Sequence, residues 1–363
     1  MATVTLKNIG GVDLTIRDRE FVVLTGPAGD GSNIIRSIAG LGKVLEGEIL
    51  FDDRRISDLP SKDRDVALLS HDYIPYPDMS VYQNLAIGLE RRKFASAEIR
   101  KRVASVAETL DLQNHLAASP GSLSPEQRRL MGLARVMVRQ PKVYLFEEPF
   151  ANLGRAAANR GRAAVAELRQ RSMATILYAT SHPTEALAFG ARTVIVEGGS
   201  VQQDADAHAI FDEPANVSVA KFFGDPPMNL VEGTLKQERD AVIFSETGDG
   251  TIAIRLPASR FASGNELTGR TIVLGFRPEA IEIAAPPEEG SRSGANFRAL
   301  VERAEPRGSE ADLYLRTGAH ELICRSRRWA GQGAGGHRFQ FEIELEKAHL
   351  FDPVSGRRLI LGR

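Results

Sequence analysis

The chain has 363 residues, 42% of them hydrophobic and 26% charged, with a formal net charge of -1. This composition is typical of a soluble globular protein, and the balanced charge excludes bulk electrostatic attraction to nucleic acid. The length exceeds what one hydrophobic core usually supports, so we expect two domains.

The first 55 residues are predicted to form short strands. Residues 3–9 and 12–16 alternate between apolar and polar side chains, and an apolar run follows at 19–26. The segment 46–53 ends in turn-forming residues, which is also typical of a strand.

A glycine-rich stretch, GPAGDGSNII, begins at Gly26, directly after the third predicted strand. A helix is expected over about 33–41, because Ile34, Ile35 and Ile38 fall on one helical face. A strand, a glycine loop and a helix in this order form the setting of a phosphate-binding loop.

Helices and strands then alternate up to about residue 200, which predicts a largely parallel α/β sheet. The arginines of the helix around residue 130 are interpreted as its solvent-exposed face. The strand at 142–146 ends at Glu147 and Glu148, as a buried parallel strand with polar groups at its carboxyl end would. The expected helices are 95–116, 127–140, 155–170 and one from about 184, and the other strands are 174–181 and 192–199.

After about residue 230 the pattern changes to short alternating segments separated by Gly, Pro, Asp and Ser. This spacing predicts a small all-β barrel or sandwich, with a polar surface loop at 283–296. The expected strands are 241–246, 251–256, 271–277, 311–317, 320–326 and 339–345.

No run of 18 or more apolar residues occurs, so no membrane-spanning helix is predicted. The single cysteine, Cys324, cannot form a disulfide within the chain, which indicates a reducing, cytoplasmic compartment. At a membrane, the chain would act through other subunits.

The order of these segments resembles the ATP-binding subunits of ABC importers, in particular the carbohydrate and glycerol-3-phosphate type related to the maltose importer ATPase. The similar stretches include EFVVLTGPAGDG, YIPYPDMSVYQNLAIGL, LSPEQRRLMGLARVMVRQPKVYLFEEPFANL and, near the C-terminus, KAHLFDPVSGRRL. The resemblance implies an ABC cassette of the P-loop NTPase class over residues 1–230, with a RecA-like core and a helical subdomain. It implies an OB-type regulatory β-barrel of the TOBE type over residues 231–363.

The same resemblance assigns site residues, with ATP and Mg²⁺ as the implied ligands. Glu147 stands at the Walker B position and Glu148 at the general base, while Ser181 and His182 lie in the switch region. The nucleotide-binding positions are Gly26, Gly29, Asp30, Gly31, Ser32, Asn33, His71, Ser124 and Gln127.

The phosphate loop departs from the G-x-x-x-x-G-K-[ST] pattern. Ser32 stands at the Lys position and Asn33 at the hydroxyl position, while Asp30 adds a carboxylate. A unit charge about 4 Å from a phosphate is worth roughly 4 kcal/mol near a protein surface, so weak ATP binding is expected.

Other family positions depart as well. His71 replaces the family glutamine, Pro125 and Glu126 replace two signature glycines, and Gly154 replaces an aspartate. The turn before the second strand offers no aromatic side chain for adenine, and His182 is displaced by one position from the switch histidine. The competing interpretation is that the glycine loop is retained for packing and that His71 and His182 are simple surface residues.

The segment YIPYPDMSVYQNL, with Tyr73, Tyr76 and Tyr82, resembles the family surface that docks transmembrane permeases. The leading interpretation is a hydrolysis-impaired ATPase subunit at the inner face of the cell membrane. Its expected partners are permeases, a second intact ATPase subunit and, indirectly, a solute-binding protein. The alternatives are a non-hydrolytic regulator or scaffold, and an active ATPase with a rearranged site that uses Glu148.

Overall fold

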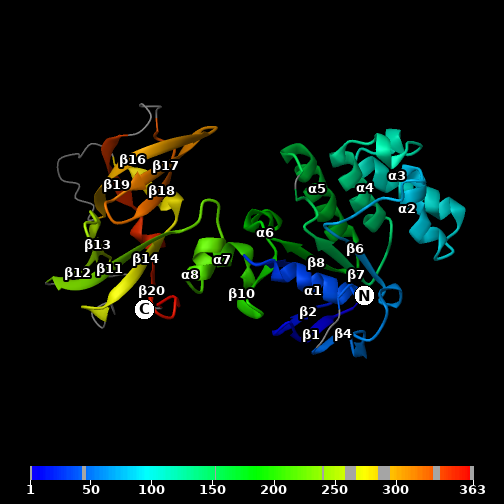
Figure 1. Cartoon of the computed structure of the whole chain (residues 1–363), viewed down its shortest axis with the longest axis horizontal. Coiled ribbons are helices and arrows are strands. Elements are labelled where there is room, and N and C mark those ends of the chain that lie inside the picture. Colours follow the sequence, from blue (N-terminus) through cyan, green and yellow to red (C-terminus); the bar gives the residue numbers. More distant parts are fainter. Residues whose placement is uncertain are drawn as a thin grey trace. The chain divides into compact units, whose positions relative to one another are not determined.

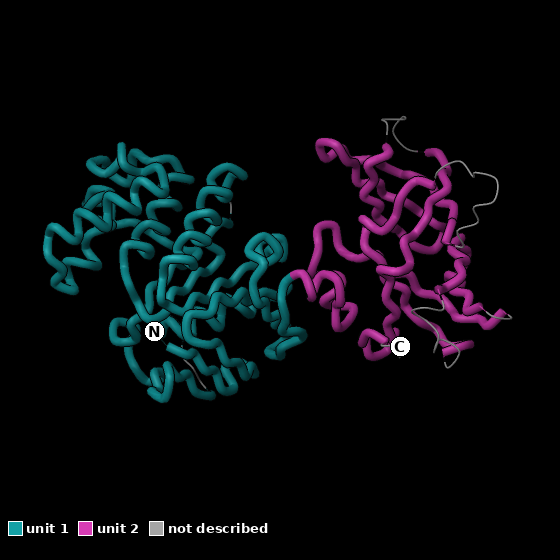
Figure 2. The backbone as a smooth tube through the Cα atoms, turned by 180° about the vertical axis from the view of Figure 1, so that it is seen from behind, with its two compact units in different colours: residues 1–207 teal, residues 208–363 magenta. Residues whose placement is uncertain are grey.

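The computed structural model describes residues 2–42, 46–151, 153–238, 241–257, 267–284, 295–329 and 336–359. They form two compact units, residues 1–207 and 208–363 (Figure 2). The expected functional boundary near residue 230 stays a prediction, and most of the expected loop at 283–296 lies outside the described residues.

Unit 1 is built around a six-stranded sheet with the order β10-β9-β3-β8-β7-β6. All neighbouring strands are parallel except the hairpin between β9 and β10. The strands are β3 (Phe21–Thr25), β6 (Val66–Leu69), β7 (Val143–Glu147), β8 (Thr175–Thr180), β9 (Arg192–Glu197) and β10 (Ser200–Asp206).

A second, antiparallel sheet in unit 1 has the order β2-β1-β4-β5. Its apolar face and that of the large sheet share one core with helix α1 (Asp30–Ala39), to which Ile34, Ile35 and Ile38 contribute. Figure 1 shows α1 between the labelled strands of the two sheets. The strands are β1 (Val4–Ile9), β2 (Val12–Ile16), β4 (Glu48–Phe51) and β5 (Arg54–Arg55).

The remaining helices of unit 1 cover the large sheet and form a helical group around α2, α3 and α4 (Figure 1). None of the helices within the described ranges has the length and hydropathy that a membrane crossing needs. The helices are α2 (Val81–Glu90), α3 (Ser96–Thr109), α4 (Pro125–Met137), α5 (Arg155–Arg171) and α6 (Pro183–Phe189), with short 3₁₀ helices at Ser61–Asp63, Gln113–His115 and Pro120–Ser122.

The fold class predicted from the sequence is confirmed, but some boundaries differ. Helix α1 begins three residues earlier than expected, because Gly29 adopts a left-handed conformation with φ of 72° and starts the helix at Asp30. Helix α3 ends at Thr109 and not at Leu116, since Asp111 has a φ of 58° that no α-helix can continue through. Strand β6 and helix α2 were not predicted.

Helix α7 (Ala207–Asp212) starts at the boundary between the units, and unit 2 continues with α8 (Val217–Phe222) and two five-stranded antiparallel sheets. Their inner faces share one apolar core, so the strands form a barrel-like structure (Figure 1). One sheet has the order β13-β12-β11-β14-β20, with β11 (Asn229–Glu238), β12 (Ala241–Glu246), β13 (Ala253–Leu256), β14 (Thr271–Phe276) and β20 (His349–Phe351). The other has the order β15-β19-β16-β17-β18, with β15 (Ile281–Ile283), β16 (Asn296–Arg307), β17 (Glu310–Arg316), β18 (Glu321–Ser326) and β19 (His337–Ile343).

Arg64 anchors the carboxyl end of α1. Its guanidinium is buried and donates to the carbonyl oxygens of Ser37 and Ile38, at 2.7 and 3.0 Å. It also donates to the carbonyls of Leu59 and Ser57, at 2.8 and 2.7 Å. One side chain therefore satisfies the open carbonyls of the helix end and holds the neighbouring loop.

Replacing Arg64 with Met should lower the free energy of unfolding by about 2–4 kcal/mol, because four carbonyls lose a charged donor. Chemical denaturation followed by circular dichroism measures the change. The matched control is Arg54→Met, on exposed strand β5, with an expected change within about 0.5 kcal/mol. Equal stability of the two variants would contradict the anchoring role.

Candidate functional site

The carboxyl ends of β3, β8 and β7 bring three predicted site segments to one edge of the large sheet. Strand β3 leads into Gly26, β7 ends at Glu147, and β8 lies between them and ends before Ser181. Thr25 Oγ donates to the carbonyl oxygen of Thr180 at 2.6 Å, which joins the ends of β3 and β8. In open α/β sheets, this edge is where ligands bind.

The fold alone favours glycine at each of the three glycine positions of the loop. A Cβ atom at Gly26 would lie 1.9 Å from the carbonyl oxygen of Val196 on β9. One at Gly31 would lie 3.0 Å from the carbonyl oxygen of Leu24, where α1 crosses β3. Gly29 needs its positive φ, although open space surrounds it. Packing of α1 against the sheet therefore requires Gly26 and leaves little room at Gly31, while the backbone conformation favours glycine at position 29, whether or not a phosphate binds.

The amino end of α1 faces the loop with no side-chain cap. The N–H of Ser32 donates to the carbonyl oxygen of Gly29 at 3.0 Å, and the first-turn N–H groups of Asp30 and Gly31 remain for an anion, as at other helix amino ends that bind phosphate. Asp30 occupies the first turn, and its Oδ2 atom is buried with no hydrogen-bond partner in the described parts of the chain. Asp30 thus adds a carboxylate to the first turn of α1, directly after the loop.

Glu147 is buried at the end of β7, with 2% of its surface exposed. Its Oε1 accepts a hydrogen bond from Arg36 Nε on α1 at 2.6 Å. Arg36 Nη2 also donates to Asp72 Oδ2 at 3.0 Å, and the bond to Glu147 is the main cause that raises the pKa of Arg36. An internal cation therefore neutralises the carboxylate at the predicted Walker B position. The sequence showed Arg36 but not its partner, because the pair joins residues 111 positions apart.

Glu148 adopts a left-handed backbone with φ of 43°, which is uncommon for a residue with a side chain. Its Oε1 accepts a hydrogen bond from the backbone N–H of Ser181 at 2.5 Å. The structure therefore brings together the predicted general base and one switch residue. Strained backbone of this kind is concentrated at functional sites.

Arg129 holds this region together from α4. It donates to the carbonyl oxygens of Glu148 at 2.6 Å, of Pro149 at 2.8 Å and of both Ser70 and His71 at 2.9 Å. The interpretation of this arginine as part of a solvent-exposed helix face was wrong, because its guanidinium donates to carbonyls of two other segments. Burial in this position lowers the pKa of Arg129. Helical periodicity alone could not locate these distant acceptors.

Ser124 and Gln127 form a capping box at the start of α4. Ser124 Oγ accepts from the N–H of Gln127 at 3.1 Å, and Gln127 Oε1 accepts from the N–H of Ser124 at 3.0 Å. Glu126 turns toward the next segment, where its Oε1 accepts from the N–H of Gly154 at 3.2 Å. The signature-like residues are thus engaged in hydrogen bonds within their own chain.

The two histidines are exposed. His71 contributes its carbonyl oxygen to Arg129, and the N–H of His182 donates to Thr180 Oγ at 3.1 Å. Gly10 and Gly11 form a tight turn between β1 and β2 with φ of 59° and 86°, so the hairpin tip presents no aromatic side chain. Within the described residues, no group of three or more His, Cys, Asp or Glu side chains could hold a metal ion.

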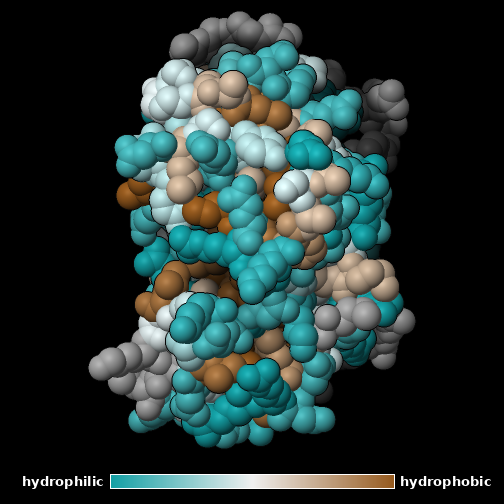
Figure 3. Space-filling model, turned by 90° about the vertical axis from the view of Figure 1, so that its right-hand side faces the viewer, coloured by the Kyte–Doolittle hydropathy of each residue, from teal (hydrophilic) through white to brown (hydrophobic). Residues whose placement is uncertain are grey.

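The segment with Tyr73, Tyr76 and Tyr82 is fixed by one residue of α2. Asn84 is fully buried and accepts from the N–H of Tyr76 at 2.8 Å, while its Nδ2 reaches three carbonyl oxygens of the segment. Ile74 and Tyr76 remain 78% and 38% exposed. Figure 3, which views the side of α2 and α3, shows hydrophobic residues between hydrophilic ones on this face.

A glycine loop between a parallel strand and a helix, with two carboxylates after a nearby parallel strand, defines the P-loop class of nucleotide-binding cassettes. Family models support a closer assignment. A model described as ABC transporter matches residues 9–151, and one described as MalK OB fold domain matches residues 224–281.

Relatives match almost the whole chain. The uncharacterized ABC transporter ATP-binding protein YurJ of Bacillus subtilis is 36% identical over 343 residues, which are 94% of this chain and 92% of that protein. The sn-glycerol-3-phosphate import ATP-binding protein UgpC of Bordetella avium is 36% identical over 378 aligned residues, with 99% of each chain covered. The chain therefore belongs to the family of ABC transporter ATP-binding proteins.

A solved structure agrees on the fold. The dimeric ATP-binding cassette MJ0796 bound to ADP and Pi has a TM-score of 0.51 and 21% identity, and covers 56% of this chain and 98% of its own. At this identity the likeness concerns the fold alone.

Proteins of the ABC ATPase family bind ATP with Mg²⁺. The orphaned Oε2 of Glu147 is one donor that fits this ion. Ser32 lies four residues before Arg36, hence on the same face of α1, and offers a hydroxyl one turn away. A carboxylate and a hydroxyl fit a Mg²⁺ ion that arrives with a nucleotide. The phosphates would supply the remaining ligands of the ion, and the ion would neutralise their charge.

If the loop glycines serve packing, then Gly26→Ala should destabilise the chain without any nucleotide, by about 2–4 kcal/mol, since the new Cβ clashes with β9. Gly29→Ala should cost only about 1 kcal/mol, for the positive φ. Denaturant titrations of both variants in nucleotide-free buffer measure these values. A Gly26→Ala protein as stable as the original would show that the glycine is not required for packing.

Proposed function

We propose that this chain is the ATP-binding subunit of a carbohydrate-type or glycerol-phosphate-type ABC importer, impaired in hydrolysis and paired with a competent ATPase subunit. The relative named for sn-glycerol-3-phosphate import and the match to a MalK OB fold domain support the importer class. We place the cassette at residues 1–230 and the regulatory barrel at 231–363. The chain would act at the inner face of the cell membrane, bound to permeases.

One observation carries the proposed impairment: Glu147 and Glu148 are each bound within the chain, while the loop supplies no cation. Glu147 pairs with Arg36 and Glu148 accepts from the N–H of Ser181. The stretch from Gly26 to Asn33 contains no Lys or Arg. Asp30 adds like charge near the phosphate position, so we expect weak binding of ATP with Mg²⁺.

The geometry of Glu126 extends the impairment to a second composite site. ABC cassettes share their sites across a dimer, with one chain's loop facing the other's signature. In this chain the signature carboxylate of Glu126 binds Gly154, where a Cβ would lie 2.6 Å from Glu126 Oε1. The phosphate loop of the proposed partner would therefore face a signature whose Glu126 carboxylate is bound to Gly154. A homodimer of this chain should hydrolyse almost no ATP.

Permease docking is proposed for the segment with Tyr73, Tyr76 and Tyr82, on which Ile74 and Tyr76 are exposed. The exposed Ile74 and the rigid hold of Asn84 on the segment support this assignment. The solute-binding protein would then be an indirect partner, through the permeases.

Two other functions are open. The first is a non-hydrolytic regulator with the same fold. It would explain why Glu147 and Glu148 are bound within the chain, but it would not require the exposed apolar segment around Ile74. An active ATPase with a rearranged site would use Glu148, whose strained backbone is the observation in its favour.

The isolated chain should bind ATP at least tenfold more weakly than a relative with an intact loop, because one favourable charge is absent and one unfavourable charge is present. Equilibrium dialysis with Mg²⁺ and ATP measures affinity, and phosphate release measures turnover. Turnover that Glu148→Gln abolishes would establish the rearranged ATPase instead. Under the proposed function, the purified complex that contains Glu148→Gln should still hydrolyse ATP, and this hydrolysis should depend on the second ATPase subunit.

Replacing Asn84 with Ala should free the docking segment and reduce co-purification of permeases at least several-fold, because its carbonyls and the Tyr76 N–H lose their buried partner. Pull-down from native membranes, with quantitative immunoblotting, measures the loss. Glu90→Ala, exposed at the end of the same helix, is the control. A pull-down that recovers no permease would favour the free regulator, and one with only copies of this chain would contradict the heterodimer.

A further inference from the structure

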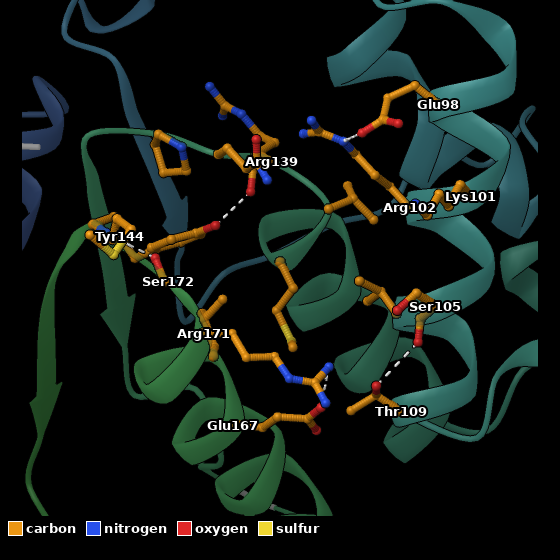
Figure 4. Close-up of a pocket in the computed structure, with 18 residues that line it drawn as sticks. Glu98, Lys101, Arg102, Ser105, Thr109, Arg139, Tyr144, Glu167, Arg171 and Ser172 are labelled. Carbon is orange, nitrogen blue, oxygen red and sulfur yellow. Dashed lines mark hydrogen bonds and ion pairs between the residues drawn. The ribbon is translucent and has the colours of Figure 1, made fainter.

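A cavity of about 570 Å³ lies in unit 1, away from the site described above. It is formed by α3, the carboxyl ends of α4 and α5, and the amino ends of β7 and β8 (Figure 4). The predicted nucleotide site lies at the carboxyl ends of the same strands. The cavity is thus at the opposite edge of the sheet, and its volume suits a small organic ligand.

Cationic side chains are in excess around the cavity. Four cations line it against two carboxylates, and each carboxylate is paired: Glu98 with Arg102 at 2.6 Å and Glu167 with Arg171 at 2.7 Å. Lys101 adds an exposed charge at the rim. The balance of charge in the cavity therefore favours an anion.

Two of the guanidinium groups have buried nitrogen atoms without partners. Arg102 Nη1 and Arg139 Nε make no hydrogen bond within the described part of the chain. Both guanidinium groups lie near the hydroxyl of Tyr144. Burial raises the pKa of this hydroxyl to about 12, while the positive charges of Arg102 and Arg139 act to lower it. Figure 4 shows Arg102 extending from α3 toward the segment of Arg139 and Tyr144. Buried donors without partners are rare, so this end of the cavity fits an acceptor.

The rest of the lining is apolar. Val106, Met137 and Leu168 come from three different helices, and Met173, 53% exposed, lies beside the opening. A wholly polar anion would leave this surface without contact. A ligand with an apolar body would bury it and remove that apolar surface from water, which is favourable.

We propose that this cavity binds a small organic anion that has an apolar body and one carboxylate, sulfonate or phosphate group. The anionic group lies against Arg102 and Arg139, and the body lies over Met137 and Leu168. Helix α4 begins at the Ser124 cap and ends at this cavity. A ligand here therefore contacts the far end of the helix that carries the signature-like residues.

The probe for a first test is 1-anilinonaphthalene-8-sulfonate, compared with uncharged N-phenyl-1-naphthylamine, which lacks the sulfonate. In fluorescence titrations of the full chain, the sulfonate should bind more tightly. Arg139→Met should weaken its binding about tenfold and leave the uncharged probe unaffected, since one charged hydrogen bond is lost. Arg100→Met, exposed on α3 outside the cavity, is the matched control.

Several results would overturn the proposal: equal affinity for the two probes, an equal effect of Arg100→Met, or displacement of the sulfonate by ATP. If Arg139→Met does not fold by circular dichroism, Arg102→Met takes its place in the same comparison.

A second measurement locates the probe. The single native cysteine, Cys324, is buried, and burial raises the pKa of its thiol, so it should not react. Ser105→Cys would place a reactive thiol in the cavity lining, and the sulfonate should slow its labelling by maleimide severalfold. Labelling of Arg100→Cys should not change. Equal protection of both thiols, or of neither, would contradict binding in this cavity.

Discussion

The ion pair between Arg36 and Glu147 is the contact on which the arrangement of the candidate site depends. It joins α1, the helix after the glycine loop, to the end of β7, and through Asp72 it extends to the segment after β6. A carboxylate this deeply buried would be strongly destabilising without a cation. Because Arg36 supplies that cation, the edge of the sheet is held together by the protein alone, and the site does not need a ligand to be stable.

Other family positions also have hydrogen-bond partners within the chain. Ser124 and Gln127 cap α4, Glu126 binds the N–H of Gly154, and Glu148 accepts from the N–H of Ser181. The carboxylates of Glu126, Glu147 and Glu148 each accept a hydrogen bond from within the chain, while Glu147 Oε2 keeps no partner in the described parts of the chain. Conversely, the segment around Tyr76 is held rigidly by Asn84 yet leaves Ile74 exposed, as a surface for another protein would be. The bound carboxylates and this exposed surface are the two observations from which the proposed role in a larger assembly is inferred.

Much of the fold was predictable because it follows local rules. The apolar run before Gly26 became β3, and the apolar positions of α1 became part of the core, as periodicity indicated. The failures also have local causes: Gly29 and Asp111 have positive φ values that set the ends of α1 and α3, and neither value can be read from residue type with certainty. The site positions were identified by resemblance, but the partners of Arg36 and Arg129 were not, since those contacts join segments far apart in the chain.

The sequence by itself determined the two-domain organisation, the cassette and barrel classes and the missing lysine of the loop, because these depend on residue order, periodicity and charge. Only the tertiary structure decided that the glycines pack against Val196 and Leu24, that Arg36 neutralises Glu147, and that Arg102 and Arg139 meet at one cavity. The physical reason is that burial and charge pairing depend on distances between segments that are remote in sequence. Such distances arise only when the helices and sheets have packed.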